Sequence, residues 1–132
     1  MSDPFTMTII ISRPGSRQQS LNIMLRTIPE INLVISLDNY LDALKLINII
    51  EGKGLNIVTL IDGQRLNESV EVGVKLLKEK TIQTYCVVLS EQPKYEEVYK
   101  SCGADVVLLE DFSALRFREI IQGLLPIKGS SQ

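Results

Sequence analysis

The apolar positions of this sequence alternate between two spacings along the whole chain. Five short runs rich in β-branched residues are typical of strands, and they lie at Thr8–Ile11, Asn32–Ser36, Asn56–Ile61, Thr84–Leu89 and Val106–Leu109. After each run, apolar residues recur every three or four positions, which is the period of a helix with one buried face. The pattern therefore predicts five consecutive strand–helix units.

Several residues mark where the predicted helices begin and end. Ser16 is placed to cap the first helix, with Gln19 three residues later as its capping-box partner. Pro93 suits the first turn of the fourth helix, because that position needs no backbone N–H. Gly103 suits the end of that helix, because glycine adopts the left-handed terminal conformation at low cost. The inward face of the fourth helix is predicted to carry Tyr95, Val98, Tyr99 and Cys102.

Alternating strands and helices indicate a parallel sheet with helices on both faces, because right-handed crossovers place them there. The nearly continuous apolar run at Asn56–Ile61 suits a central strand. Five such units fit a flavodoxin-like (βα)5 three-layer sandwich with sheet order 2-1-3-4-5. We assign residues 7–127 to this one domain. Residues 1–6 are interpreted as an expression remnant, and residues 128–132 as a disordered tail.

Composition narrows the classes of function. The formal net charge is −2, which argues against nucleic acid as a partner because phosphate binding needs a basic surface. No apolar run approaches the ~20 residues that span a bilayer, so we expect no membrane partner. The chain has no histidine, the commonest general base and metal ligand. Cys86 and Cys102 both lie in apolar patterns without a secretory signal before them, so we expect reduced thiols in a cytoplasmic protein.

In an open parallel sheet, sites form beyond the carboxyl ends of the strands. The predicted strand ends at this edge carry Ser12-Arg13, Asp62-Gly63, Ser90-Glu91 and Glu110-Asp111. What these side chains can do together is the functional question that the sequence poses.

The sequence resembles the receiver domain of two-component response regulators, the family that includes the chemotaxis regulators. Asp62 stands where that family has its phosphoacceptor aspartate, and Ser90 where it has a hydroxyl residue. Gly103-Ala104-Asp105 resembles the segment before the fifth strand, and Leu41–Leu44 resembles a segment of the second helix. The resemblance covers nearly all of Met7–Leu125 and implies the (βα)5 fold and a role in signal transduction.

The chain departs from the family at the positions that carry charge. Ser12 and Arg13 stand where the family has two acidic residues that hold Mg²⁺, an ion that needs oxygen ligands in near-octahedral array. Glu110 stands where the family has a lysine that neutralises the acyl phosphate. The usual Met-Pro after the phosphoacceptor is replaced by Arg65-Leu66. These departures predict a degenerate receiver, or pseudo-receiver, in which Asp62 is vestigial and Arg13 pairs with it in place of a cation.

A pseudo-receiver would act by binding. We expect no enzymatic activity, no cofactor, and contact with a protein partner or a second copy of the chain through the face formed by the fourth helix, the fifth strand and the fifth helix. By resemblance, Tyr95, Tyr99, Val107, Phe112 and Arg118 are candidates for that face. Tyr95 and Tyr99 also satisfy the core pattern of their helix, so packing and interface roles stay open for both.

Two other functions stay open at this point. The chain could be a phosphorylation-competent receiver that uses Asp62 with Mg²⁺, or a small-ligand sensor that binds a metabolite in the crevice at the sheet edge. The sequence names no such ligand.

Overall fold

The computed structural model describes residues 5–50, 53–63, 69–80, 84–109 and 111–125. The described elements alternate between strands and helices, in the order β1 Thr6–Ile11, α1 Ser16–Arg26, β2 Leu33–Leu37, α2 Tyr40–Ile50, β3 Asn56–Asp62, α3 Val70–Lys80, β4 Thr84–Ser90, the 3₁₀ turn η1 Pro93–Tyr95, α4 Glu96–Cys102, β5 Val106–Leu109 and α5 Ala114–Leu124. Each predicted strand and helix is present.

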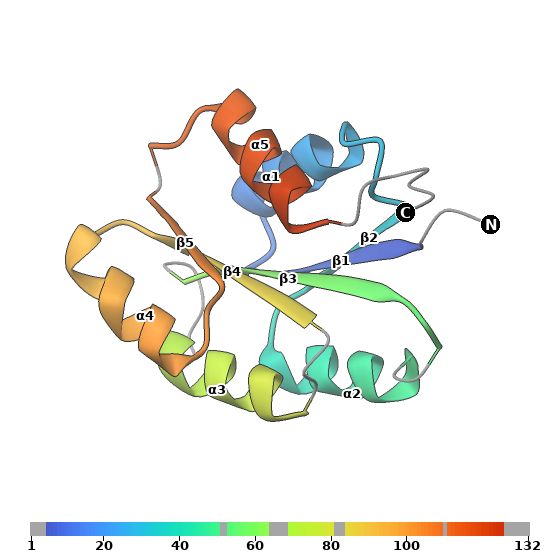
Figure 1. The fold of residues 1–132 in the computed structure, drawn as a ribbon, viewed down its shortest axis with the longest axis horizontal. Helices are drawn as coiled ribbons and strands as arrows, with labels where there is room; N and C mark the ends of the chain where they lie inside the picture. The colour runs from blue at the N-terminus through green and yellow to red at the C-terminus, as the bar shows by residue number, and fades with distance from the viewer. Residues whose placement is uncertain (1–4, 51–52, 64–68, 81–83, 110, 126–132) are drawn as a thin grey trace.

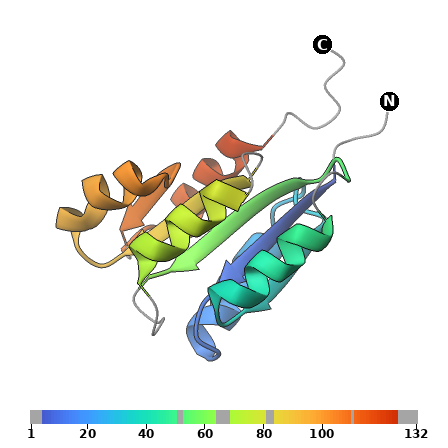
Figure 2. The same ribbon diagram turned by 90° about the horizontal axis from the view of Figure 1, so that it is seen from below.

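The strands form one parallel sheet in the order β2-β1-β3-β4-β5, as predicted. Helices α1 and α5 cover one face, and α2, α3 and α4 cover the other (Figure 1, Figure 2). The flavodoxin-like three-layer sandwich is therefore confirmed. Among the described residues, no helix has the length and apolar content needed to cross a membrane.

Two apolar clusters, one on each face of the sheet, form the core. Side chains alternate between the faces of a strand. Ile9 and Ile11 of β1 therefore pack against α2 and α3, while Ile10 packs against α1 and α5. All three are fully buried. Both faces of the central strands are thus covered, which explains why their sequences are apolar at nearly every position.

The first strand begins earlier than predicted. β1 starts at Thr6, which pairs in register with Asn56 and is 1% exposed. Its backbone N–H donates to the side-chain oxygen of Asn32, 2.7 Å away. Thr6 is therefore part of the sheet, although the sequence analysis placed it outside the domain.

The start of the first helix also differs from the prediction. Gly15, not Ser16, is the N-cap of α1, and no side chain caps this end. Gly15 has a φ of 150°, in the region that favours glycine. The turn after Pro14 therefore ends at the glycine, and Ser16 is already the first helical residue, so the predicted capping box does not form.

The segment before the fifth strand has a clear structural role. Gly103 caps the end of α4 with a φ of 121°, as predicted from its residue type. Oδ2 of Asp105 then accepts hydrogen bonds from the backbone N–H of Cys86 at 2.7 Å and from Nζ of Lys78 at 3.0 Å. The Gly103-Ala104-Asp105 segment therefore ties β4 and α3 to the beginning of β5.

Helix α4 is shorter and more exposed than its apolar pattern suggested. Pro93 opens a 3₁₀ turn, and the α-helix begins only at Glu96. Tyr95 and Val98, both predicted to face inward, are 37% and 38% exposed. Tyr99 and Cys102 pack against the core as predicted. Tyr95 ends the 3₁₀ turn and so lies outside the α-helix that its apolar spacing predicted.

Candidate functional site at the carboxyl edge of the sheet

The carboxyl ends of the central strands bring Ser12, Asp62 and Ser90 to one edge of the sheet. Asp62 is the last residue of β3 and is fully buried. Ser12 directly follows β1 and Ser90 ends β4, and their exposures are 0% and 3%. The predicted phosphoacceptor position is therefore a carboxylate enclosed by the protein.

The side chain of Ser12 forms a hydrogen bond with this carboxylate. Its hydroxyl lies 3.2 Å from Oδ2 of Asp62, within donating distance. The carbonyl of Ser12 in turn accepts a hydrogen bond of 2.9 Å from Nε2 of Gln18 in α1. The end of β1 is thus fixed to the first turns of α1, and the side chain of Ser12 contacts Asp62.

Ser90 contacts its own turn. Its hydroxyl donates to the carbonyl of Gln92 at 3.1 Å and accepts from the N–H of Gln92 at 3.3 Å. A serine hydroxyl that bonds the backbone two residues on stabilises a turn after a strand. This geometry accounts for the hydroxyl at this position without a chemical role.

Arg17, in the first turn of α1, supplies the positive charge at this edge. Its Nε lies 3.7 Å from Oδ2 of Asp62, and its side chain is only 26% exposed. The sequence analysis predicted Arg13 for this role and did not consider Arg17. The structure shows an ion pair between Asp62 and Arg17. Helix α1 starts at Ser16, so Arg17 lies in its first turn, from which its side chain reaches Asp62 at the strand ends.

Arg17 also links the edge to the last helix. Its guanidinium carbon lies 5.7 Å from the centre of the Phe112 ring, within the range of a cation–π contact. Phe112 stacks on Phe117 of α5, with ring centres 5.2 Å apart and planes 23° apart. Three segments distant in sequence therefore meet at one guanidinium.

A signal in the sequence could have identified Arg17. It lies four residues before Leu21, the first buried residue of α1. Residues four apart share a helix face, so Arg17 extends the buried stripe toward the strand ends. A charged residue on the inward face of a helix needs a partner of opposite charge. Asp62 is an acid at the predicted end of a neighbouring strand and could supply it.

These residues do not fit a magnesium ion. Mg²⁺ is held by oxygen ligands, but Oδ2 of Asp62 faces a hydroxyl and a guanidinium, and the fixed positive charge of Arg17 repels a cation. Over the described ranges, no group of three or more acidic or cysteine side chains could hold a metal ion. Glu110, at the position of the family's lysine, lies outside the described residues, as do Arg65 and Leu66; Asp111 is exposed.

The five interface candidates separate into two groups. Tyr99 and Val107 are half-buried against the core cluster beneath α4, and Tyr95 stacks on Tyr99 with ring centres 5.7 Å apart. Burial and the nearby Glu71 carboxylate raise the pKa of Tyr99. Phe112 instead packs beneath α5, and the exposed Arg118 lines a small cavity between α1 and α5. The candidates therefore do not form one continuous patch.

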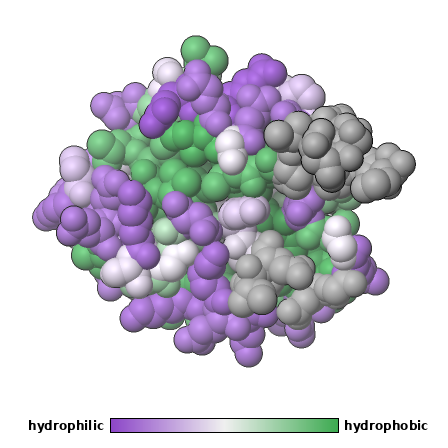
Figure 3. All heavy atoms as spheres, viewed as in Figure 1, coloured by the Kyte–Doolittle hydropathy of each residue, from purple (hydrophilic) through white to green (hydrophobic). Residues whose placement is uncertain are grey.

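The space-filling view nevertheless shows a band of apolar surface between the two helix layers (Figure 3). β5 is an edge strand of the sheet on this side of the molecule (Figure 1). Its residues Val106, Val107 and Leu109 are half-buried, so each retains some contact with solvent. An edge strand also presents backbone groups that can pair with another chain.

The fold is that of response regulator receiver domains. A DNA-binding response regulator of the LuxR family from Staphylococcus aureus superposes with a TM-score of 0.73 at 21% identity, over 90% of this chain and 98% of that one. The signal receiver domain of the response regulator NarL from Mycobacterium tuberculosis gives 0.72 at 16% identity, over 92% and 95% of the two chains. A pilus assembly-related protein from Burkholderia pseudomallei gives 0.72 at 11% identity, over 90% and 87%. No protein-family model and no curated protein matches the sequence.

Proposed function

We propose that this chain is a pseudo-receiver, a signalling module that acts by binding proteins and does not depend on phosphorylation of Asp62. The observation that carries the proposal is the fully buried Asp62 with Arg17 and Ser12 on one of its oxygens. The receiver fold supports a role in signalling, and the side chains at the sheet edge support independence from phosphate.

The electrostatics of the edge support this proposal. Phosphoryl transfer to a carboxylate depends on cations that position the phosphate and neutralise its charge. Here Arg17 already neutralises the carboxylate, and Ser12 and Arg13 replace the acids that would recruit a divalent ion. Arg17 and Ser12 would have to leave Oδ2 of Asp62 before that oxygen could attack a phosphorus atom. We therefore propose no catalysis and no cofactor for this domain.

Intact mass spectrometry tests this proposal directly. The protein is incubated with acetyl phosphate and MgCl₂, beside a receiver domain that has the complete acid pair as the positive control. We expect no mass increase for this chain under conditions that modify the control. An added phosphoryl group that is absent in Asp62→Asn would contradict the proposal and favour a phosphorylation-competent receiver.

The binding face is proposed to lie along α4 and β5. Tyr95 and Val98 expose apolar surface there, next to the half-buried residues of β5. Aromatic side chains with a polar tip are enriched at interfaces. A second copy of the chain is the simplest occupant, because edge strands and helices pair readily about a two-fold axis.

Sedimentation velocity over a range of concentrations tests self-association. We expect a monomer–dimer equilibrium that Tyr95→Ala weakens. Tyr85→Ala is the matched control, because Tyr85 is 38% exposed but lies at the other end of β4. If the wild-type chain stays monomeric at all concentrations tested, self-association through this face is contradicted.

A further inference from the structure

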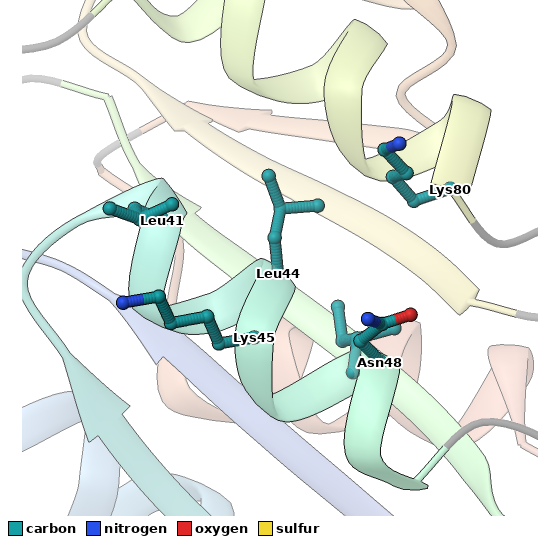
Figure 4. A pocket seen from close by; sticks show the side chains of 6 residues that line it. Leu41, Leu44, Lys45, Asn48 and Lys80 are labelled. Carbon is teal, nitrogen blue, oxygen red and sulfur yellow. The ribbon is translucent and has the colours of Figure 1, made fainter.

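An apolar groove runs between α2 and α3, on the face of the sheet opposite to the one that α1 and α5 cover. Two cavities make it up, of about 350 Å³ and about 260 Å³, and both are lined by Leu41 and Leu44. Because both are lined by these residues, the two cavities adjoin along α2. Leu44 points into the space between the two helices, and Lys80 reaches it from α3 (Figure 4).

The walls of the groove leave large apolar side chains in solvent. Leu41 of α2 is 60% exposed and Val72 of α3 is 55% exposed. Leu76 and Tyr40 complete the wall of the larger cavity. Isolated apolar residues on a surface are ordinary, but several that line one concave feature are typical of a binding site.

The charges that line the groove have one sign. Lys45 of α2 and Lys80 of α3 line the smaller cavity from opposite sides. The described residues that line the two cavities include no acidic side chain. This local positive charge contrasts with the net charge of −2 of the whole chain, so it selects an occupant with negative charge.

We propose that this groove binds an acidic amphipathic helix of a partner protein. A helix that lies between two others inserts apolar residues at intervals of three and four positions. Helices α2 and α3 have 11 residues each, so the groove is about 16 Å long and accommodates about three helical turns. Val72 and Lys80 are eight residues apart on α3, which corresponds to about 12 Å along the groove. The partner helix therefore carries apolar residues toward Leu41 and Val72 and glutamate or aspartate about two turns away, near Lys80.

Other occupants fit this surface less well. Nucleic acid binding requires more cations than two lysines around an apolar floor provide. A second copy docked through the same groove would bring lysines to the interface from both subunits without an acidic wall residue to meet them. The proposal is independent of the face along α4 and β5, because it uses different helices on a different surface.

Selection from a displayed library of helical peptides tests the proposal. Each peptide has about 14 residues, roughly four turns, with the apolar positions and the flanking charged positions varied. We expect enriched peptides to carry leucine-like anchors on one face and acids at one end. On the double variant Lys45→Glu/Lys80→Glu, the same library should yield basic residues at those positions. Enrichment without a preference for acids on the wild-type protein would overturn the proposal.

Affinity measurements then locate the site. Fluorescence anisotropy with one selected acidic peptide should show about tenfold weaker binding to the charge-reversed variant, since two attractive rim contacts become repulsive. Lys94→Glu, an exposed lysine of η1, is the charge control and should change the affinity less than about twofold. Leu41→Ala should also weaken binding, whereas Leu115→Ala on α5, with its 67% exposed leucine, should not.

Chemical-shift perturbation completes the test. Addition of the selected peptide to labelled protein should shift amide signals of α2 and α3. Shifts confined to α4 and β5, unchanged affinity in the charge-reversed variant, or a dimer of the chain that buries the groove would each overturn the proposal. All the substituted side chains are exposed, and unchanged urea denaturation curves will verify that the variants fold.

Discussion

Replacing Arg17 by methionine tests whether this residue stabilises the buried carboxylate of Asp62. Methionine keeps much of the length of the side chain but removes its charge. Two unit charges 3.7 Å apart interact by about 4 kcal/mol at an effective dielectric constant of about 20. The Arg17 side chain is 26% exposed, so solvent screens part of this energy. We expect an interaction of about 2 kcal/mol.

A double-mutant cycle with Asp62→Asn isolates this interaction. Arg17→Met alone leaves a fully buried carboxylate without this cation, which is costly. Asp62→Asn alone leaves an arginine that already reaches water, so its cost is smaller. The double variant has neither the buried carboxylate nor the arginine. We therefore expect the double variant to be more stable than Arg17→Met alone. The loss of the Phe112 contact occurs in both arginine variants and cancels from the coupling energy.

Urea denaturation, followed by far-UV circular dichroism, measures the four unfolding free energies by linear extrapolation. Arg116→Met is the matched control, since Arg116 lies exposed on α5, and its effect should stay within about 0.5 kcal/mol. A coupling energy below about 0.5 kcal/mol, or a double variant less stable than Arg17→Met, would refute the assignment of Arg17 as the cation that neutralises Asp62.

Three further predictions concern the rest of the fold. Gly73→Ala should lower the free energy of unfolding by about 1–3 kcal/mol, because the added methyl group would overlap the Tyr40 ring. Gly123→Ala on α5, where the space is open, should instead raise it by up to about 1 kcal/mol. Urea denaturation compares the two variants. Asp105→Ala should cost about 1–2 kcal/mol through the unsatisfied N–H of Cys86, and Asp105→Asn less, since its amide oxygen can still accept that bond; equal costs would contradict this explanation. Burial raises the pKa of the Cys86 thiol from 9.0 to about 12. Between these pH values the folded state keeps a proton that the unfolded chain releases. The stability present below pH 9 should therefore be lost as the pH rises toward 12, by up to about 1.4 kcal/mol per pH unit. The pH dependence of unfolding should be shallower in Cys86→Ala, and an identical slope would count against the buried thiol as its cause.

The sequence was informative about the fold because the relevant signals are local. The β-branched runs of β1 and β3 pack on both faces of the sheet, so their apolar character marks them as central strands. The alternation of elements and the handedness of the crossovers indicated a parallel sheet with helices on both faces, and five such units fit the strand order that the structure shows. Helix starts were less reliable, as at Ser16, because a cap depends on the backbone angles of the preceding loop.

The site was only partly predictable, because it depends on contacts between distant segments. Asp62, Ser12 and Ser90 were identified from their positions at strand ends, and the structure brings them to the same edge. Arg17 was missed because the search for a cation was restricted to strand ends, while this side chain reaches the edge from a helix. The distinction between Tyr95 and Tyr99 also needed coordinates, because both satisfy the same helical period.

Because Arg17 belongs to the chain itself, the sheet edge responds differently to its surroundings than a metal-dependent site would. A dissolved ion leaves its ligands by mass action when its concentration falls. A guanidinium connected covalently to α1 can be neither dialysed away nor removed by a chelator. If the proposed function holds, the Arg17–Asp62 ion pair forms when the polypeptide folds and needs no ion from the medium.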